Sequence, residues 1–266
     1  MNLIVFSNCQ GKFILERFIK QNKFFNNFTH YYIHYNEDDV CNFIKQYKNC
    51  SIFIYQPINN KTITNESFNE IIKNNLPKNC KVICFPSIYC ELWPIFPGSG
   101  LAGHTYICGD LLLRYKNYEL KKILELYDNN LLNFDLQNRF EKSINYLKNK
   151  ENKYCNIKIS DFILDNYKNI RLFDTQNHPN GIILSYIYKK ICEYVDYKTE
   201  INEFSYKDAH IDTNCYPDSY LQNKELSINY NLVDNKAYYK KLIIKLFNNP
   251  EIVKYSYAYH VDGIRK

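Results

Sequence analysis

Apolar and polar residues form two kinds of block along the first 85 residues, and the two kinds alternate. Short apolar runs are separated by longer segments whose apolar residues recur every three or four positions, the spacing of one helix face. The predicted strands are Leu3–Phe6, His30–His34, Ser51–Tyr55 and Lys81–Phe85, and the predicted helices are Gly11–Gln21, Asp38–Tyr47 and Glu66–Asn74. This alternation predicts an α/β fold with a small doubly wound parallel sheet and helices on both of its faces.

The pattern changes after the fourth predicted strand. Residues 87–109, "SIYCELWPIFPGSGLAGHTYICG", are rich in Pro, Gly and aromatic residues. A loop of this length is typical of a lid or a binding loop. Further elements are then predicted: helices at Leu111–Tyr127, Asp135–Lys150, Pro179–Val195 and Lys236–Phe247, a helix or short strand at Ile157–Asp165, and a strand at Ile170–Phe173. We therefore expect an α/β core over residues 1–195, elaborated by helical insertions, and a C-terminal extension over 196–266 packed on that core.

Composition excludes several classes of protein. The chain has 266 residues, enough for a substantial core, and a mild net charge of +6 from scattered lysines. No basic run with interleaved aromatic residues stands out, so nucleic-acid binding has little support. No apolar run approaches the roughly 18 residues of a membrane span, and no export signal precedes the first strand. We expect a cytoplasmic protein, in a bacterial cytosol or in the host cytosol if the source is viral.

The ten cysteines suggest a disulfide framework or a metal site only at first sight. In a cytosolic chain they are most simply reduced, buried, small apolar residues. Cys80, Cys84, Cys90, His104 and Cys108 could hold zinc. However, no CxxC pair occurs, and the first two of these lie along an apolar strand. Core packing is the favoured interpretation, and we expect no metal.

Polar clusters follow three of the predicted strands, at residues 7–10, 55–57 and 85–87. In an open parallel sheet all strands end at one edge, and ligands bind in the crevice outside that edge. A fourth cluster, "TQNHPN" at residues 175–180, opens a predicted helix. We therefore expect segments that are far apart in the sequence to converge on one site.

Cys9 and His178 are the reactive side chains of these clusters. Cys9 stands where the first strand turns into a helix, and Pro179, favoured in a first helical turn, would put His178 at an N-cap. The partial positive charge of a helix N-terminus favours a thiolate and disfavours an imidazolium. This pairing suits a cysteine nucleophile with a neutral histidine base. A lone cysteine after a strand can equally be a core residue.

Oxyanion stabilisation is predicted for the turn around Cys9. The backbone N–H groups of Gln10 and Gly11, together with the side-chain amide of Asn8, could donate to a developing negative charge.

Six stretches carry a resemblance to a known family. They are "SNCQ", "YQPI", "VICFPSIYCELWP", "FDLQNRFEKSINYLKNKE", "IKISDFI" and "RLFDTQNHP", in this order. The chain resembles the WcbI-type polysaccharide-biosynthesis acetyltransferases, which bind coenzyme A (CoA) and act on sugars of capsular and related glycans. The resemblance runs from the N-terminus to about Val195 and implies a cradle-like α/β fold with a CoA cleft.

The resemblance also implies roles for single residues. It places the nucleophile at Cys9 and the base at His178. Four further residues match other motif positions: Asn8, Gln10, Pro86 and Asn177. Acetyl-CoA would be the co-substrate, and a sugar, a nucleotide sugar or a glycan would be the acceptor. The chain departs from the family at Ser7, where glycine is common, and in its poorly matching tail, so the acceptor is the least transferable part.

Several supporting residues remain open. The turn at Cys9 is also similar to the nucleophile elbow of SGNH hydrolases, with Cys in place of Ser. Asp174 and Asp161 are candidates for the acid that orients the histidine, or else are capping or solvated carboxylates. Four candidates for binding substrate or CoA are Ser7, Lys12, Gln56 and Ser87. Of these, Gln56 and Ser87 can also be read as ordinary turn residues.

Three functions follow from these observations. The leading hypothesis is an acetyltransferase that moves an acetyl group from acetyl-CoA to a sugar hydroxyl. The alternatives are an SGNH-type esterase or deacetylase of glycans, and a non-catalytic protein that binds glycans or nucleotides. CoA binding separates the first from the other two, because an esterase has no need of a pantetheine cleft.

Overall fold

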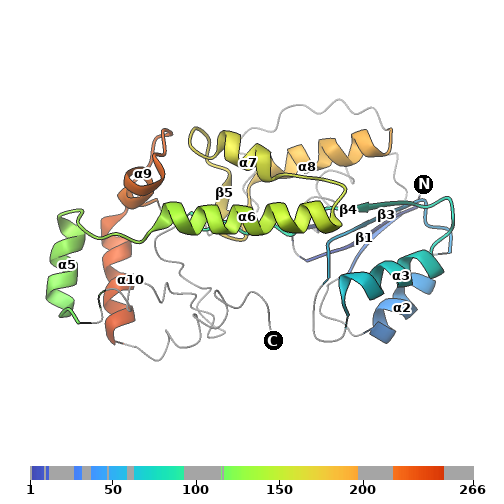
Figure 1. Ribbon diagram of the computed structural model, residues 1–266, viewed down its shortest axis with the longest axis horizontal. Coiled ribbons are helices and arrows are strands. Elements are labelled where there is room, and N and C mark those ends of the chain that lie inside the picture. Colours follow the sequence, from blue (N-terminus) through green and yellow to red (C-terminus); the bar gives the residue numbers. More distant parts are fainter. Residues whose placement is uncertain are drawn as a thin grey trace. The chain divides into compact units, whose positions relative to one another are not determined.

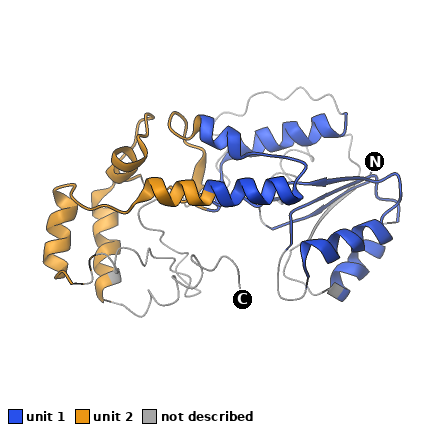
Figure 2. Ribbon diagram, viewed as in Figure 1, with its two compact units in different colours: residues 1–89, 144–165, 177–213 blue, residues 90–143, 166–176, 214–266 orange. Residues whose placement is uncertain are grey.

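The computed structural model describes residues 2–8, 10–11, 27–31, 37–46, 48–58, 63–92, 115, 117–196 and 218–248. The chain forms two compact units: residues 1–89, 144–165 and 177–213 make unit 1, and residues 90–143, 166–176 and 214–266 make unit 2 (Figure 2). Helix α6 (Leu136–Tyr154) begins in unit 2 and ends in unit 1. The division into a core over 1–195 and an extension over 196–266 stays a prediction.

Unit 1 contains a four-stranded parallel sheet (Figure 1). Its strands are β1 (Asn2–Phe6), β2 (Asn27–Tyr31), β3 (Ile52–Tyr55) and β4 (Lys81–Cys84), in the order β2-β1-β3-β4. Each neighbouring pair is parallel. The predicted α/β class and small parallel sheet are therefore confirmed, although β2 begins and ends three residues earlier than predicted. Helices on both faces and the cradle-like shape stay predictions.

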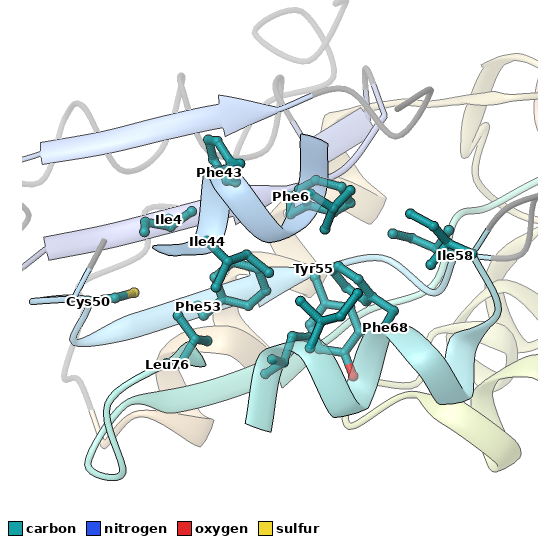
Figure 3. Packing of buried hydrophobic residues seen from close by; sticks show 14 of the residues in the cluster. Ile4, Phe6, Phe43, Ile44, Cys50, Phe53, Tyr55, Ile58, Phe68 and Leu76 are labelled. Carbon is teal, nitrogen blue, oxygen red and sulfur yellow. The ribbon is translucent and has the colours of Figure 1, made fainter. Parts of the chain in front are cut away.

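The apolar residues of the strands alternate between the two faces of the sheet. Phe6, Phe53 and Tyr55 point into one cluster with Phe68 from α3 (Asn65–Asn75), and Phe43 from α2 (Glu37–Lys45) closes it (Figure 3). The Phe68 ring lies 5.1 Å from the Phe6 ring and 5.3 Å from the Tyr55 ring, measured between centroids. We call this set the apolar cluster. Because the strands are parallel, all of them end at one edge of the sheet, which we call the carboxyl edge.

The helix that follows the fourth polar cluster begins later than predicted. Helix α8 spans Gly181–Tyr194, and His178 and Pro179 form the short strand β6. Asn180 is the N-cap, because its Oδ1 accepts a hydrogen bond of 3.0 Å from the N–H of Ile182. The placement of His178 at the N-cap and of Pro179 in the first turn is therefore wrong. An asparagine amide oxygen caps a helix well, and Asn180 stood next in the sequence.

Unit 2 is mainly helical in the part of the chain that the structure describes. It contains α5 (Leu120–Asp128), the start of α6, β5 (Phe173–Thr175), α9 (Tyr220–Leu226) and α10 (Lys236–Asn248). Of the helix predicted over 111–127, residues 117–119 are not helical and α5 begins at Leu120, while the strand predicted at 170–173 begins at Phe173. Helix α9 was not predicted. Its capping box, Ser219 with Gln222 three residues later, was the available signal.

Candidate functional site

Two buried glutamine side chains join the segments that follow the strands. Gln56, after β3, is fully buried, and its Oε1 accepts a hydrogen bond of 2.9 Å from the N–H of Asn8. Its Nε2 donates to Oε1 of Gln10 and to the carbonyl oxygen of Pro86, both at 3.3 Å. Gln56, predicted to bind substrate, therefore holds the site together from inside, because its donors and acceptor are engaged by the protein.

Gln10 extends the same network to two more segments. Its Nε2 donates to the carbonyl oxygens of Ile88 and Asn177, each at 2.7 Å, and its Oε1 accepts from the N–H of Ile88 at 2.9 Å. Four segments, from residues 8–10, 56, 86–88 and 177, thus meet at the carboxyl edge, as predicted from the strand topology. We call the hydrogen bonds of Gln10 and Gln56 the amide network.

The turn after β1 is closed by Asn8. Its Oδ1 accepts from the N–H of Gln10 at 2.9 Å, and its carbonyl oxygen accepts from the N–H of Gly11 and from Oγ of Ser7, both at 3.1 Å. The two N–H groups predicted to stabilise an oxyanion are thus already bonded within the turn, so this arrangement does not support that role. Ser7 is fully buried beneath the turn, so its predicted contact with CoA has no support either.

Gly11 is required by close packing in this turn. A Cβ atom on Gly11 would lie 1.8 Å from Oγ and 2.4 Å from Cβ of Ser7. Real Cβ atoms do not approach this closely, so any larger residue must displace the buried Ser7. The sequence pattern placed Gly11 in the turn but did not reveal this contact.

Cys9 and Lys12 lie outside the described residues. Their assignments, as nucleophile and as a CoA-binding residue, stay predictions. The sequence neighbours of Cys9, Asn8 and Gln10, both belong to the hydrogen-bonded arrangement at the carboxyl edge.

His178 lies one residue beyond that arrangement. It is half-buried, and the carbonyl oxygen of the preceding residue, Asn177, accepts from Gln10. The network therefore fixes the backbone on which the imidazole is carried. Because Asn180 is the N-cap of α8, His178 lies two residues before the cap.

The two candidate acids have different surroundings. Asp174, on β5 in unit 2, is fully buried, and its assignment as the acid that orients the histidine stays a prediction. Asp161 lies in the first turn of α7 (Ser160–Asn166), with a side chain that is 77% exposed and 2.8 Å from Nζ of Lys148. Asp161 is thus a partner in a surface ion pair, where a negative charge also suits the helix N-terminus.

Lys150 is a site residue that the sequence interpretation missed. Its Nζ donates to Oγ of Ser87 at 2.9 Å and to the carbonyl oxygen of Ser87 at 3.1 Å. Burial of the ammonium group lowers the pKa of Lys150. Ser87, predicted to contact substrate, is thus bonded to a half-buried cation next to the amide network. Lys150 stood in the stretch "NYLKNKE", but nothing in its spacing singled it out from the other lysines.

The neighbouring Glu151 has a structural role. Its carboxylate is buried and accepts from the N–H groups of Ile159 at 2.8 Å and Ser160 at 3.1 Å, and from Oγ of Ser160. Burial raises the pKa of Glu151. The sequence contained a signal for this buried position, because Glu151 continues the spacing of an apolar stripe along the helix. That stripe consists of Leu136, Phe140, Ile144 and Leu147.

Two cavities in the described residues lie away from the amide network. An open cavity of about 680 Å³ in unit 2 is lined by asparagines and by Tyr220 and Tyr230. Another, of about 420 Å³ in unit 1, is lined by residues that include Tyr186 and Lys190. Neither contains a member of the amide network, so we place the candidate site by its chemistry rather than by cavity size.

Two further findings concern the described residues alone. They include no group of three or more His, Cys, Asp or Glu side chains that could hold a metal ion. Among the helices described, none has the length and apolar character needed to cross a membrane.

Comparison with known proteins gives one family and one fold. The family model described as "Polysaccharide biosynthesis enzyme WcbI" matches residues 2–200. A solved structure of WcbI, described as a novel polysaccharide biosynthesis enzyme in a native form without a disulfide bond between CoA and one of its cysteines, is similar with a TM-score of 0.73. The two chains are 15% identical, and the similarity covers 99% of this chain and 96% of the other. No curated protein matches the chain.

Proposed function

Because the chain belongs to the WcbI family of polysaccharide biosynthesis enzymes, we propose that it transfers an acetyl group from acetyl-CoA to a hydroxyl group of a sugar or glycan precursor. The observation that carries this proposal is the amide network. It holds the sequence neighbours of Cys9, the Pro86–Ile88 segment and the backbone before His178 together at the carboxyl edge of the sheet. A parallel sheet binds its ligands at that edge.

CoA is supported as the co-substrate by two observations. The similar WcbI structure is described as the native protein without a disulfide bond between CoA and one of its cysteines. In this chain, the Lys150 ammonium group and the Ser87 hydroxyl stand together at the carboxyl edge, a pair suited to a phosphate oxygen of CoA. Lys12 is a second cation that the sequence places close to Cys9.

The proposed chemistry uses two side chains. As the sugar oxygen attacks the acetyl carbonyl carbon, His178 accepts the hydroxyl proton. The carbon–sulfur bond of the thioester breaks, and the proton passes from His178 to the sulfur of CoA. Cys9 either receives the acetyl group first, as a thioester, or lies beside the CoA sulfur.

The test measures CoA affinity and acetyl-CoA turnover on the same preparations. His178→Asn should bind CoA nearly as well as the wild type and lose about 100- to 10,000-fold in turnover, because proton transfer is removed. Cys9→Ala should behave in the same way. Asp161→Asn is the control, since Asp161 forms only a surface ion pair, and it should keep full turnover.

Two outcomes would overturn the proposal. Wild-type protein that binds neither CoA nor acetyl-CoA, but releases acetate from acetylated sugars, would be an esterase. Full turnover in His178→Asn would remove histidine from the mechanism.

A further inference from the structure

Two thiols that the proposed function does not use lie in contact beside the candidate site. Cys84 is the last residue of β4, and Cys155 follows the last residue of α6. Their sulfur atoms are 3.9 Å apart, with Cys84 as the hydrogen-bond donor. Both thiols are free. The residues are 71 positions apart in the sequence, so nothing in the spacing of the cysteines predicted this pair.

The backbones that carry these thiols are bonded to each other. The carbonyl oxygen of Cys84 accepts from the N–H groups of Asn156 at 2.9 Å and Ile157 at 3.1 Å. The N–H of Cys84 donates to Oδ1 of Asn156 at 2.7 Å. The segment after Cys155 therefore lies along Cys84, and side-chain rotation together with a small backbone shift can bring the sulfurs from contact to the bonded distance of about 2.05 Å.

The two thiols differ in accessibility. Cys155 is half-buried, whereas Cys84 is only 1% exposed. The hydrogen bond with Cys155 and burial both raise the pKa of the Cys84 thiol. A soluble oxidant would thus meet Cys155 first, with Cys84 held beside it as the thiol that completes the reaction.

We propose that Cys84 and Cys155 form a reversible disulfide that joins the end of β4 to the end of α6 next to the candidate site. The oxidant is a low-molecular-weight disulfide, with oxidised glutathione as the probe. The Cys155 thiolate attacks one glutathione sulfur, and the first glutathione thiolate leaves. Cys84 then loses its proton to solvent, its sulfur attacks that of Cys155, and the second glutathione thiolate leaves. Two protein thiols are oxidised, and one glutathione disulfide is reduced to two thiols.

The position of this bond connects it to the site. Cys84 lies two residues before Pro86, whose carbonyl oxygen accepts from Gln56, and Cys155 lies five residues after Lys150, which holds Ser87. The disulfide would join the segment that leads to Pro86 covalently to the end of the helix that carries Lys150. It would also close a long loop and raise the melting temperature.

The experiment incubates the full chain with oxidised glutathione, alkylates the remaining thiols and maps peptides without reduction. We expect a linked Cys84–Cys155 peptide pair, a protein mass about 2 Da lower from the loss of two hydrogens, and reversal by dithiothreitol. Cys155→Ser should abolish the link and leave Cys84 alkylatable in unfolded protein. Cys41→Ser, which changes a half-buried thiol on α2, should leave the link intact.

Cys50 and Cys80 provide an internal comparison. Their thiols also lie close together, because a hydrogen bond with Cys80, together with burial, raises the pKa of the Cys50 thiol. The Cys50 thiol in addition donates to the carbonyl oxygen of Ile52 at 3.1 Å, a bond that would have to break before a disulfide could form. Glutathione retained on Cys155 without a link to Cys84, or a link between Cys50 and Cys80 in preference to it, would overturn the proposal. Because the readout is a peptide mass, its failure is independent of whether the protein binds CoA.

Discussion

The apolar cluster and the amide network lie in the same unit but are stabilised by different physical terms. The cluster packs aromatic rings, with Phe68 against Phe6 and Tyr55, and depends on shape and area. The network buries polar groups whose donors and acceptors must match one by one, as at Gln10 and Gln56. A folded core needs only the first kind of region. The second is costly unless fully bonded, and it stands where the proposed chemistry takes place.

The largest effect on stability is expected from a substitution in the apolar cluster. Phe68→Ala should lower the free energy of unfolding by about 3–5 kcal/mol, because it removes a fully buried ring and leaves a cavity. Urea denaturation measures this loss. CoA affinity should not change at concentrations of urea where the variant is folded. A loss below about 1 kcal/mol would mean that the cluster closes around the cavity.

A smaller effect on stability is expected from the polar side. Gln56→Leu leaves the N–H of Asn8 and the carbonyl oxygen of Pro86 without their partner, and should cost about 1–3 kcal/mol. Its effect on CoA affinity should exceed that of Phe68→Ala, because the segments of the site are no longer joined. Gln137→Leu, which changes an exposed glutamine on α6, is the matched control. Unchanged CoA affinity in Gln56→Leu would show that the network serves the fold alone.

Glu151 allows a buried polar group outside the amide network to be tested by the pH dependence of stability. Burial raises its pKa in the folded protein above the ordinary value of 4.5. Between 4.5 and the raised value, the folded protein binds more protons than the unfolded chain. The contribution of Glu151 to the free energy of unfolding should therefore fall as pH rises through that window. Glu151→Gln removes this dependence and should cost about 1 kcal/mol at low pH, because Ser160 loses one acceptor.

Urea denaturation of both proteins at several pH values measures the difference. The advantage of the wild type over Glu151→Gln should shrink as pH rises. An advantage that grows would mean that the hydrogen bonds from Ile159 and Ser160 outweigh the burial of the carboxylate.

The smallest effects on stability are expected for two lysines. Lys81 lies at the start of β4, and Lys150 lies on α6 beside Ser87 at the carboxyl edge. Lys81, the first residue of β4, forms an exposed ion pair of 3.2 Å with Asp196, and Lys81→Met should change stability by less than about 1 kcal/mol. Lys150→Met removes the half-buried cation from Ser87 and should weaken CoA binding while Lys81→Met does not. Isothermal titration with CoA tests both. Equal affinities would place the phosphate groups of CoA elsewhere.

Much of this fold could be predicted because the strands carry their own signal. The runs around Phe6, Phe53 and Ile83 are apolar without interruption, as strands buried on both faces must be. Their order along the chain then implied a common edge for the polar clusters. The convergence of residues 8–10, 56, 86–88 and 177 needed no motif, only the rule that parallel strands end together.

The roles of individual side chains were harder to predict, because polar residues in a turn can face inward or outward. Gln56 and Ser7 are polar residues in turns after strands, as ligand-binding residues often are, and the sequence alone does not distinguish the two cases. In the structure both are fully buried. His178 was predicted to be the N-cap because proline is common at the first helical position. In the structure, Oδ1 of Asn180 accepts the capping hydrogen bond from the N–H of Ile182 instead. Lys150 was missed because its role depends on a fold that brings α6 to Ser87.

Asn156 has a consequence for the behaviour of the protein at high concentration. Strand β4 is an edge of the sheet, and an exposed strand edge is a template on which another chain can add a strand and begin to aggregate. At Cys84 both backbone groups that face outward are already taken, one by the side chain of Asn156 and the other by the N–H groups that follow Cys155. The loop between α6 and α7 thus occupies the hydrogen-bonding groups of β4 at Cys84. It prevents another strand from pairing with the sheet at the point nearest the candidate site.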